Sequence, residues 1–184
     1  EQACAERNLL DFDDLLLQSA RLVQGTPALR AHLHQRWSYL LVDEYQDTNA
    51  IQYELLRLLI GPERNIMVVG DEDQAIYGFR GADVQHILRF ERDFPDARIV
   101  RLEANYRSTP EILAAANAVI AHNSVRLGKT LQPTRPSGDL VQVVTAATER
   151  EEATAIADEI VDLLNRGACT PDDIAILYRA GARA

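Results

Sequence analysis

Residues 40–49 read LLVDEYQDTN, so two adjacent carboxylates, Asp43 and Glu44, directly follow a short apolar run. The run at 39–42 is typical of a strand that is buried on both faces. In nucleotide hydrolases, carboxylates at the end of such a strand hold Mg²⁺ and prepare a water molecule. An acidic helix start, which complements the helix dipole, explains the same two residues on spacing alone. Taken by itself, the stretch leaves both interpretations open.

Strands and helices alternate along the rest of the chain. Helical spacing and capping residues predict helices over 8–24, after Pro27, around 51–59, from Thr109-Pro110 to about His122, and from the capping box Thr148-x-x-Glu151 onward. Short apolar runs predict strands at 39–42, 66–69, 99–102, 141–144 and 174–177. This alternation predicts an α/β fold with a mostly parallel sheet flanked by helices.

Three polar stretches, 43–44, 70–74 and 103–107, each follow an expected strand directly. Because ligands bind beyond the carboxyl ends of parallel strands, we expect these stretches to share one rim of the sheet. Gln74 is a neutral donor and acceptor suited to contact a γ-phosphate. Arg107 carries the fixed charge that stabilises a phosphoryl-transfer transition state. The rim therefore fits phosphoryl transfer.

The stretch VGDEDQAIYGFRGAD, residues 69–83, sets Tyr77, Phe79 and Arg80 among glycines. Exposed aromatic rings beside an arginine form a platform on which nucleic-acid bases stack. Burial of the two rings in the core is the alternative, since aromatic side chains are usually buried.

Composition limits the choice of partners and compartment. The net charge of −9 argues mildly against nucleic acid, because phosphate contacts normally require an excess of Lys and Arg. No apolar stretch is long enough to span a membrane. Cys4 and Cys169 match no metal or disulfide spacing, which favours a reducing cytoplasm, and the four histidines form no ligand cluster.

Several segments together resemble one family. LLVDEYQDTN, VGDEDQAIYGFRGADV and LEANYRST, at 40–49, 69–84 and 102–109, are similar to the second, third and fourth motifs of superfamily 1 DNA helicases of the UvrD/PcrA/Rep type. NLLDFDDLL at 8–16 and DDIAILYR at 172–179 resemble flanking segments of the same proteins. The resemblance covers nearly the whole chain and favours the magnesium site and the exposed platform over their alternatives.

The resemblance implies two RecA-like domains with ATP between them, in motors that move 3′-to-5′ on single-stranded DNA and act at junctions with duplex. It implies that Asp43 coordinates Mg²⁺ and that Glu44 is the catalytic base and a second Mg²⁺ contact. The other implied roles are Gln74 and Arg107 at the γ-phosphate, Tyr106 stacked on adenine, and Tyr77, Phe79 and Arg80 facing DNA. DNA repair is the kind of process such motors serve.

The phosphate-binding loop of such a motor is not found in the sequence. The only Gly-Lys-Thr, residues 128–130 in NSVRLGKT, has Asn123 where the phosphate loop needs its first glycine. We therefore expect a helicase fragment whose sheet is incomplete at both ends, with the phosphate loop upstream of Glu1 and an arginine-bearing motif downstream of Ala184. The isolated chain is expected to be inactive and prone to self-association through exposed sheet surface.

Residues 1–107 are expected to complete the first RecA-like domain, with 1–36 as a helical lead-in, and 108–184 to begin the second. Two alternatives stay open: a non-catalytic DNA- or protein-binding module, and part of a helicase-nuclease subunit.

Overall fold

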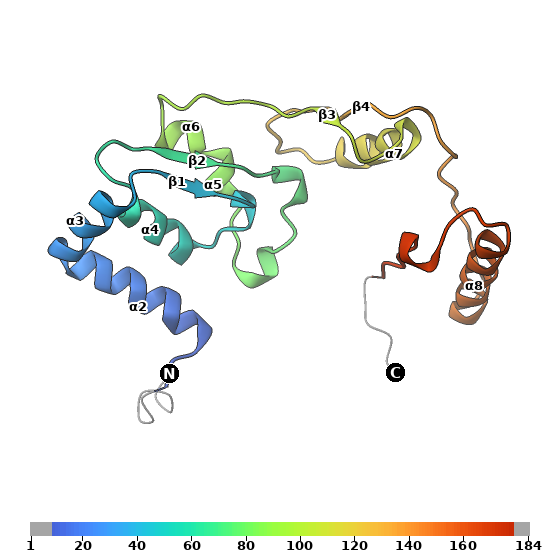
Figure 1. The fold of residues 1–184 in the computed structure, drawn as a ribbon, viewed down its shortest axis with the longest axis horizontal. Coiled ribbons are helices and arrows are strands. Elements are labelled where there is room, and N and C mark those ends of the chain that lie inside the picture. Colours follow the sequence, from blue (N-terminus) through green and yellow to red (C-terminus); the bar gives the residue numbers. More distant parts are fainter. Residues whose placement is uncertain (1–8, 179–184) are drawn as a thin grey trace. The chain divides into compact units, whose positions relative to one another are not determined.

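The computed structural model describes residues 9–178; residues 1–8, which include Cys4, and 179–184 lie outside this description. The chain divides into two compact units, Glu1–Asp139 and Leu140–Ala184, which are treated separately below. Figure 1 shows the order of the elements along the chain.

Two helices lead into the first strand. Helix α2 (Phe12–Gly25) begins with a capping box, in which the Asp11 carboxylate accepts a hydrogen bond from the Asp14 N–H at 2.8 Å. Helix α3 (Pro27–Arg36) begins with proline at its first position, where the missing N–H costs nothing. Both helices pack against α4 (Ala50–Leu59). The helix expected over 8–24 is confirmed from Phe12 onward, and the helix expected after Pro27 is confirmed as well.

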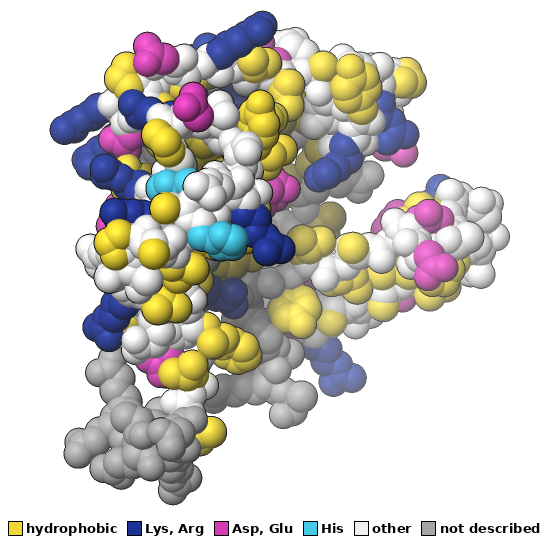
Figure 2. All heavy atoms as spheres, turned by 60° about the vertical axis from the view of Figure 1, so that its left-hand side comes forward, with side chains coloured by type: hydrophobic (Ala, Val, Ile, Leu, Met, Phe, Trp, Pro, Cys, Tyr) yellow, Lys and Arg dark blue, Asp and Glu magenta, His cyan; other side chains and the backbone are white. Residues whose placement is uncertain are grey.

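The first sheet is a parallel pair, β1 (Leu40–Val42) and β2 (Ile66–Val68), joined through α4. Leu40 lies opposite Ile66 and Val42 opposite Val68. The prediction that these strands are buried on both faces is wrong, because the side chains of Leu41 and Met67 are 76% and 58% exposed. Side chains alternate between the faces of a strand, and only one face of this pair is covered by the described residues. Figure 2 shows hydrophobic side chains reaching the surface among Lys and Arg side chains.

Aromatic rings fill the space beside this pair. Buried Tyr45 meets Phe90 edge to face at 5.7 Å between ring centroids, and burial raises the pKa of Tyr45 to about 12. Tyr53 stacks on His86 at 4.2 Å and donates a hydrogen bond to Asp93 at 2.7 Å. Through these contacts α4 holds the short helices α5 (Gln85–Leu88) and α6 (Phe90–Asp93).

A second parallel pair follows, made of β3 (Ala104–Asn105) and β4 (Gln132–Pro133) and joined through α7 (Pro110–Ile120). The helix expected from Thr109-Pro110 is confirmed. The strand expected at 99–102 does not form, and the chain becomes a strand only at 104–105. An apolar run supplies a suitable surface, but a strand also requires a hydrogen-bonded neighbour, and none lies beside 99–102 among the described residues.

The unit formed by residues 140–184 is built around α8 (Glu149–Asn165). Its expected N-terminus is confirmed, because Thr148 Oγ1 accepts a hydrogen bond from the Glu151 N–H at 3.2 Å. Glu151 reaches back to the Ala147 N–H, at 3.1 Å, rather than to Thr148. The strands expected at 141–144 and 174–177 are absent from the described part of this unit, where they find no partner strand.

The observed architecture is an α/β arrangement of helices with two short parallel pairs, β1-β2 and β3-β4. The parallel pairing expected from the sequence is therefore observed, but as two separate two-stranded pairs. Among the described residues, no helix is long and apolar enough to cross a membrane.

Candidate functional site

Asp43 and Glu44 lie directly after β1, and both are exposed. The Asp43 Oδ1 atom accepts a hydrogen bond from the Glu44 N–H at 2.9 Å. Glu44 adopts a left-handed backbone, with φ of 49° and ψ of 41°, which is costly for a residue with a side chain and is often found at functional sites. The α-helix that follows begins only at Ala50, capped by Asn49. The acidic pair therefore lies directly before the 3-10 turn Tyr45–Asp47, where Glu44 makes no side-chain cap, and not in the first turn of an α-helix.

Gln46 connects the end of β1 to the end of β2. This side chain is 1% exposed. Its Nε2 donates to Glu44 Oε2 at 2.7 Å, and its Oε1 accepts from the Asp71 N–H at 3.0 Å. The Tyr45 N–H adds a backbone bond to the Val69 carbonyl at 3.0 Å. The two polar stretches that follow β1 and β2 are thus brought together, as expected for neighbouring parallel strands.

The stretch after β2 is a single 3-10 turn, Glu72–Gln74, capped by Asp71. The Gln74 Nε2 donates to Asp71 Oδ2 at 2.7 Å, and Lys129 forms an ion pair with the same carboxylate. Burial raises the pKa of Asp71, but the hydrogen bonds from Lys129 and Gln74 outweigh burial, so the net pKa lies below the usual value. Gln74 itself stays exposed at this edge of the pair.

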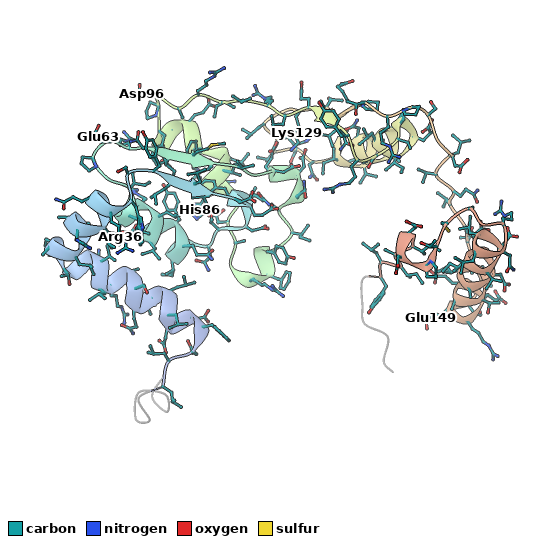
Figure 3. All side chains as sticks on the ribbon, viewed as in Figure 1. Arg36, Glu63, His86, Asp96, Lys129 and Glu149 are labelled. Carbon is teal, nitrogen blue, oxygen red and sulfur yellow. The ribbon has the colours of Figure 1, made fainter. Side chains whose placement is uncertain are left out.

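The segment Arg126–Lys129, which carries two basic side chains, packs against this acidic turn. Arg126 contacts Asp73 through Nε at 2.8 Å and Nη2 at 2.7 Å, which raises the pKa of the Arg126 guanidinium. The Leu127 N–H donates to Glu72 Oε1 at 2.9 Å. Figure 3 labels Lys129, which extends from the loop after α7. We call these contacts the acidic–basic clamp.

The clamp also explains the Gly-Lys-Thr at 128–130. Gly128 has a φ of 74° in a loop, and no helix follows it before β4. The expectation that this is not a phosphate loop is confirmed by its geometry, because a phosphate loop opens a helix with free amides and a free lysine. The sequence analysis missed both Gln46 and the clamp. The runs DED at 71–73 and RLGK at 126–129 are opposite in charge and were the available signal.

The aromatic platform is exposed. Phe79 is 79% exposed and Tyr77 37%, so neither ring belongs to the core. Their ring centroids lie 6.0 Å apart. The Arg80 guanidinium lies 5.1 Å from the Tyr77 ring and 5.3 Å from the Phe79 ring, at distances typical of cation–π pairs. The three side chains form one cluster on the turn Gly78–Arg80.

Tyr106 and Arg107 follow β3, which belongs to the other parallel pair. Tyr106 is 76% exposed. The Arg107 N–H donates to Asn105 Oδ1 at 3.0 Å, and its carbonyl accepts from Arg135 at 2.8 Å. Within residues 9–178, no hydrogen bond or ion pair joins the Arg107 guanidinium to the acidic pair after β1. The structure therefore brings together the polar stretches 43–44 and 70–74. The third stretch, 103–107, belongs to the separate pair β3-β4.

The acidic pair suits Mg²⁺ with a nucleotide. Among the described residues, no group of three or more His, Cys, Asp or Glu side chains is placed to hold a metal ion by itself. Mg²⁺ in nucleotide sites requires less, since it takes one or two carboxylates and completes its shell with phosphates and water. Asp43 and Glu44 are adjacent, exposed oxygen donors and meet that need.

Parallel strands that end in carboxylates and a glutamine, joined by α-helices, are typical of nucleotide-binding α/β proteins. The model of the UvrD/REP helicase N-terminal domain matches residues 1–95, and that of the UvrD-like helicase C-terminal domain matches 100–184. The chain belongs to the UvrD-like helicase family.

Curated relatives match almost the full chain. A probable DNA helicase II homolog of Rickettsia felis is 48% identical over 174 residues, which is 95% of this chain and 27% of the relative. ATP-dependent DNA helicase PcrA of Staphylococcus epidermidis is 45% identical and DNA helicase II of Escherichia coli 44%, each over 183 residues, 100% of this chain and 25% of the relative. The chain thus spans about a quarter of the length of these relatives.

Proposed function

We propose that the chain is part of an ATP-dependent DNA helicase that couples ATP hydrolysis to 3′-to-5′ movement on single-stranded DNA. The observation that carries the proposal is the bridge through Gln46, which ties the carboxylate of Glu44 to the turn that presents Gln74. A motor needs such a connection, because the group that activates water must respond to the group that contacts the phosphate. The family match and the names of the relatives support the same function.

At the nucleotide, Asp43 and Glu44 are the residues that would hold Mg²⁺ bound with ATP. The ion supplies neutralisation of the charge that develops on the phosphates. Glu44 accepts a proton from the attacking water, and its carboxylate is held for this by Gln46. Gln74 contacts the γ-phosphate as a neutral donor, and Asp71 orients it through the 2.7 Å hydrogen bond.

Tyr106 and Arg107 complete the nucleotide site in this proposal. Tyr106 offers an exposed ring for stacking on adenine, and Arg107 a fixed positive charge for the γ-phosphate. The proposal assigns both to the border between two RecA-like domains, with 1–107 in the first and 108–184 in the second. The change from one family match to the other between residues 95 and 100 supports a border in this region.

Single-stranded DNA is the proposed partner of the aromatic platform. Tyr77 and Phe79 present ring faces to solvent, and Arg80 adds a positive charge beside them. Stacking is tolerant of sequence, which suits a motor that moves along a strand, and it needs little net positive charge. Reliance on stacking therefore weakens the objection that the net charge of −9 raises against DNA binding. We propose that the motor acts at junctions between single-stranded and duplex DNA. We also propose that the isolated chain self-associates through the exposed face of β1 and β2.

The test uses the full protein that carries this chain. We expect ATP hydrolysis that single-stranded DNA stimulates, and displacement of a strand from a duplex with a 3′ single-stranded tail but not from one with a 5′ tail. Hydrolysis that DNA leaves unchanged would contradict the proposal. Displacement from the 5′-tailed duplex alone would contradict the direction. Degradation of the DNA would favour the helicase-nuclease alternative.

A further inference from the structure

We propose that Gln46 is a positioning residue that orients the Glu44 carboxylate and makes its position depend on the turn that carries Gln74. The inference rests on the proposed role of Glu44 as the base. Gln46 is 1% exposed and so is not placed to contact a substrate, whereas Glu44, to which it is hydrogen-bonded, is exposed.

The hydrogen bonds around Gln46 determine which way its amide faces. The Asp71 N–H is a donor, so it must meet the amide oxygen, at 3.0 Å. The amide nitrogen then faces the Glu44 carboxylate at 2.7 Å, with Asp47 Oδ2 farther away at 3.4 Å. A glutamate at position 46 would turn an oxygen toward Glu44, and a hydrophobic residue would leave the Asp71 N–H unpaired. Only a side chain with one acceptor and one donor satisfies both neighbours.

The backbone at Gly70 packs closely against the Gln46 amide. Gly70 lies so close that a Cβ there would come 2.7 Å from Gln46 Oε1 and 2.9 Å from Ile87 Cδ1. It would also lie 3.2 Å from the backbone nitrogen of Tyr45. The absence of a side chain at position 70 is therefore a condition for the amide to reach both loops. Steric fit and hydrogen bonding select the same placement independently.

The contacts form one continuous path. Gln74 donates to Asp71 Oδ2, the Asp71 N–H donates to Gln46 Oε1, and Gln46 Nε2 donates to Glu44 Oε2. If contact with phosphate shifts the Gln74 turn, the Asp71 N–H therefore moves as well. Gln46, which is hydrogen-bonded to that N–H, then moves the Glu44 carboxylate. Glu44 has a left-handed backbone, which a residue with a side chain does not favour. Contacts from other residues, such as Gln46, are therefore needed to keep Glu44 in place. The path provides a way for phosphate contact to align the base.

The test uses Gln46→Met, which keeps volume and removes both hydrogen bonds, and Gly70→Ala, which displaces the amide from outside. Both are made in the full protein that carries this chain. We expect kcat for ATP to fall about 10- to 100-fold, because the base is misplaced, while the Kd for ATP stays within about threefold. Thr48→Val is the matched control. It removes the buried 2.8 Å bond from Thr48 Oγ1 to the Tyr45 carbonyl, in the same turn, and leaves the Gln46 contacts in place.

A double-mutant cycle with Glu44→Gln separates positioning from general loosening of the turn. If Gln46 acts through Glu44, then Gln46→Met adds little to the loss already caused by Glu44→Gln. Additive losses, an equal loss in Thr48→Val, or a kcat within about threefold of the parent in a folded variant would each overturn the inference. If Glu44→Gln itself keeps full turnover, it is the proposed function that fails, so the two failures are distinguishable.

Discussion

Arg126 holds the carboxylate of Asp73 with two hydrogen bonds, of 2.8 and 2.7 Å, although the residues are 53 positions apart in the sequence. This bidentate pair anchors the acidic–basic clamp, and the clamp fixes the turn that presents Gln74. Charge-assisted, two-point contacts of this kind are among the stronger polar interactions in proteins, and they specify geometry as well as affinity. The geometry of the candidate site therefore depends on a loop that follows α7.

Asp73→Asn should loosen this clamp, because the remaining amide offers Arg126 one acceptor in place of two. The Leu127 N–H reports on the loop, since it is bonded to Glu72 at 2.9 Å. We expect its amide hydrogen exchange to accelerate about tenfold. Asp162→Asn, which breaks the exposed pair between Arg166 and Asp162 on α8, is the control and should leave Leu127 unchanged. Unchanged exchange in Asp73→Asn would show that the ion pair does not hold the loop.

Acid should weaken the same region through Asp71. Burial raises the pKa of this carboxyl, but hydrogen bonds from Lys129 and Gln74 bring it below the usual value. A depressed pKa means that the contribution to stability is present above the usual carboxyl pKa, about 3.9, and is lost as the pH falls through the folded value. Asp71→Asn removes this contribution. The free energy of unfolding, measured with urea, should therefore fall less in the variant than in the parent between about pH 6 and about pH 3. An identical loss in both proteins would contradict the assignment.

Replacement of Tyr77 and Phe79 by alanine should weaken binding of single-stranded DNA by the full protein. Each lost stack is expected to cost about 1–3 kcal/mol, and stimulation of the ATPase by DNA should fall with it. The basal ATPase without DNA should change little. Phe12→Ala removes an exposed ring elsewhere, 89% accessible on α2, and serves as the control. Unchanged DNA affinity by fluorescence anisotropy would remove the platform from the DNA site.

The isolated chain should not hydrolyse ATP and should bind it weakly. Asp43 and Glu44 repel a triphosphate unless Mg²⁺ intervenes, and Lys129 is engaged by Asp71. The amides and lysine of a phosphate loop, which supply most of the grip in such sites, have no matching pattern in residues 1–184. Calorimetry with Mg²⁺ and a non-hydrolysable ATP analogue should give a Kd of about 1 mM, close to −4 kcal/mol. A micromolar Kd would contradict this account.

Local patterns predicted the local structure well. Thr148 caps its helix with its own side chain, and Pro27 and Pro110 begin helices as their fixed backbone favours. These features depend on residues within one turn of each other, so the sequence alone carries the information. The strands β1 and β2 and the contact between their loops followed from the same reasoning.

Pairing between segments that are far apart in the chain was harder to predict from the sequence. The apolar runs at 99–102, 141–144 and 174–177 have suitable composition for strands but find no neighbour among the described residues. The pairing of Arg126 with Asp73 and the burial of Gln46 likewise depend on segments that are brought together only by the fold. In the sequence, Gln46 is an ordinary polar residue between Tyr45 and Asp47. Its role became visible only through its bond to the backbone of Asp71.

Substitution of Glu44 by glutamine tests the central claim most directly, because it keeps the size of the side chain and removes the base. In the full protein, steady-state ATP turnover should fall about 10²- to 10⁴-fold while ATP binding survives. Glu54→Gln, at an exposed position on α4, should leave turnover unchanged. Turnover of Glu44→Gln within about threefold of the parent would contradict the account and remove Glu44 from the catalytic role.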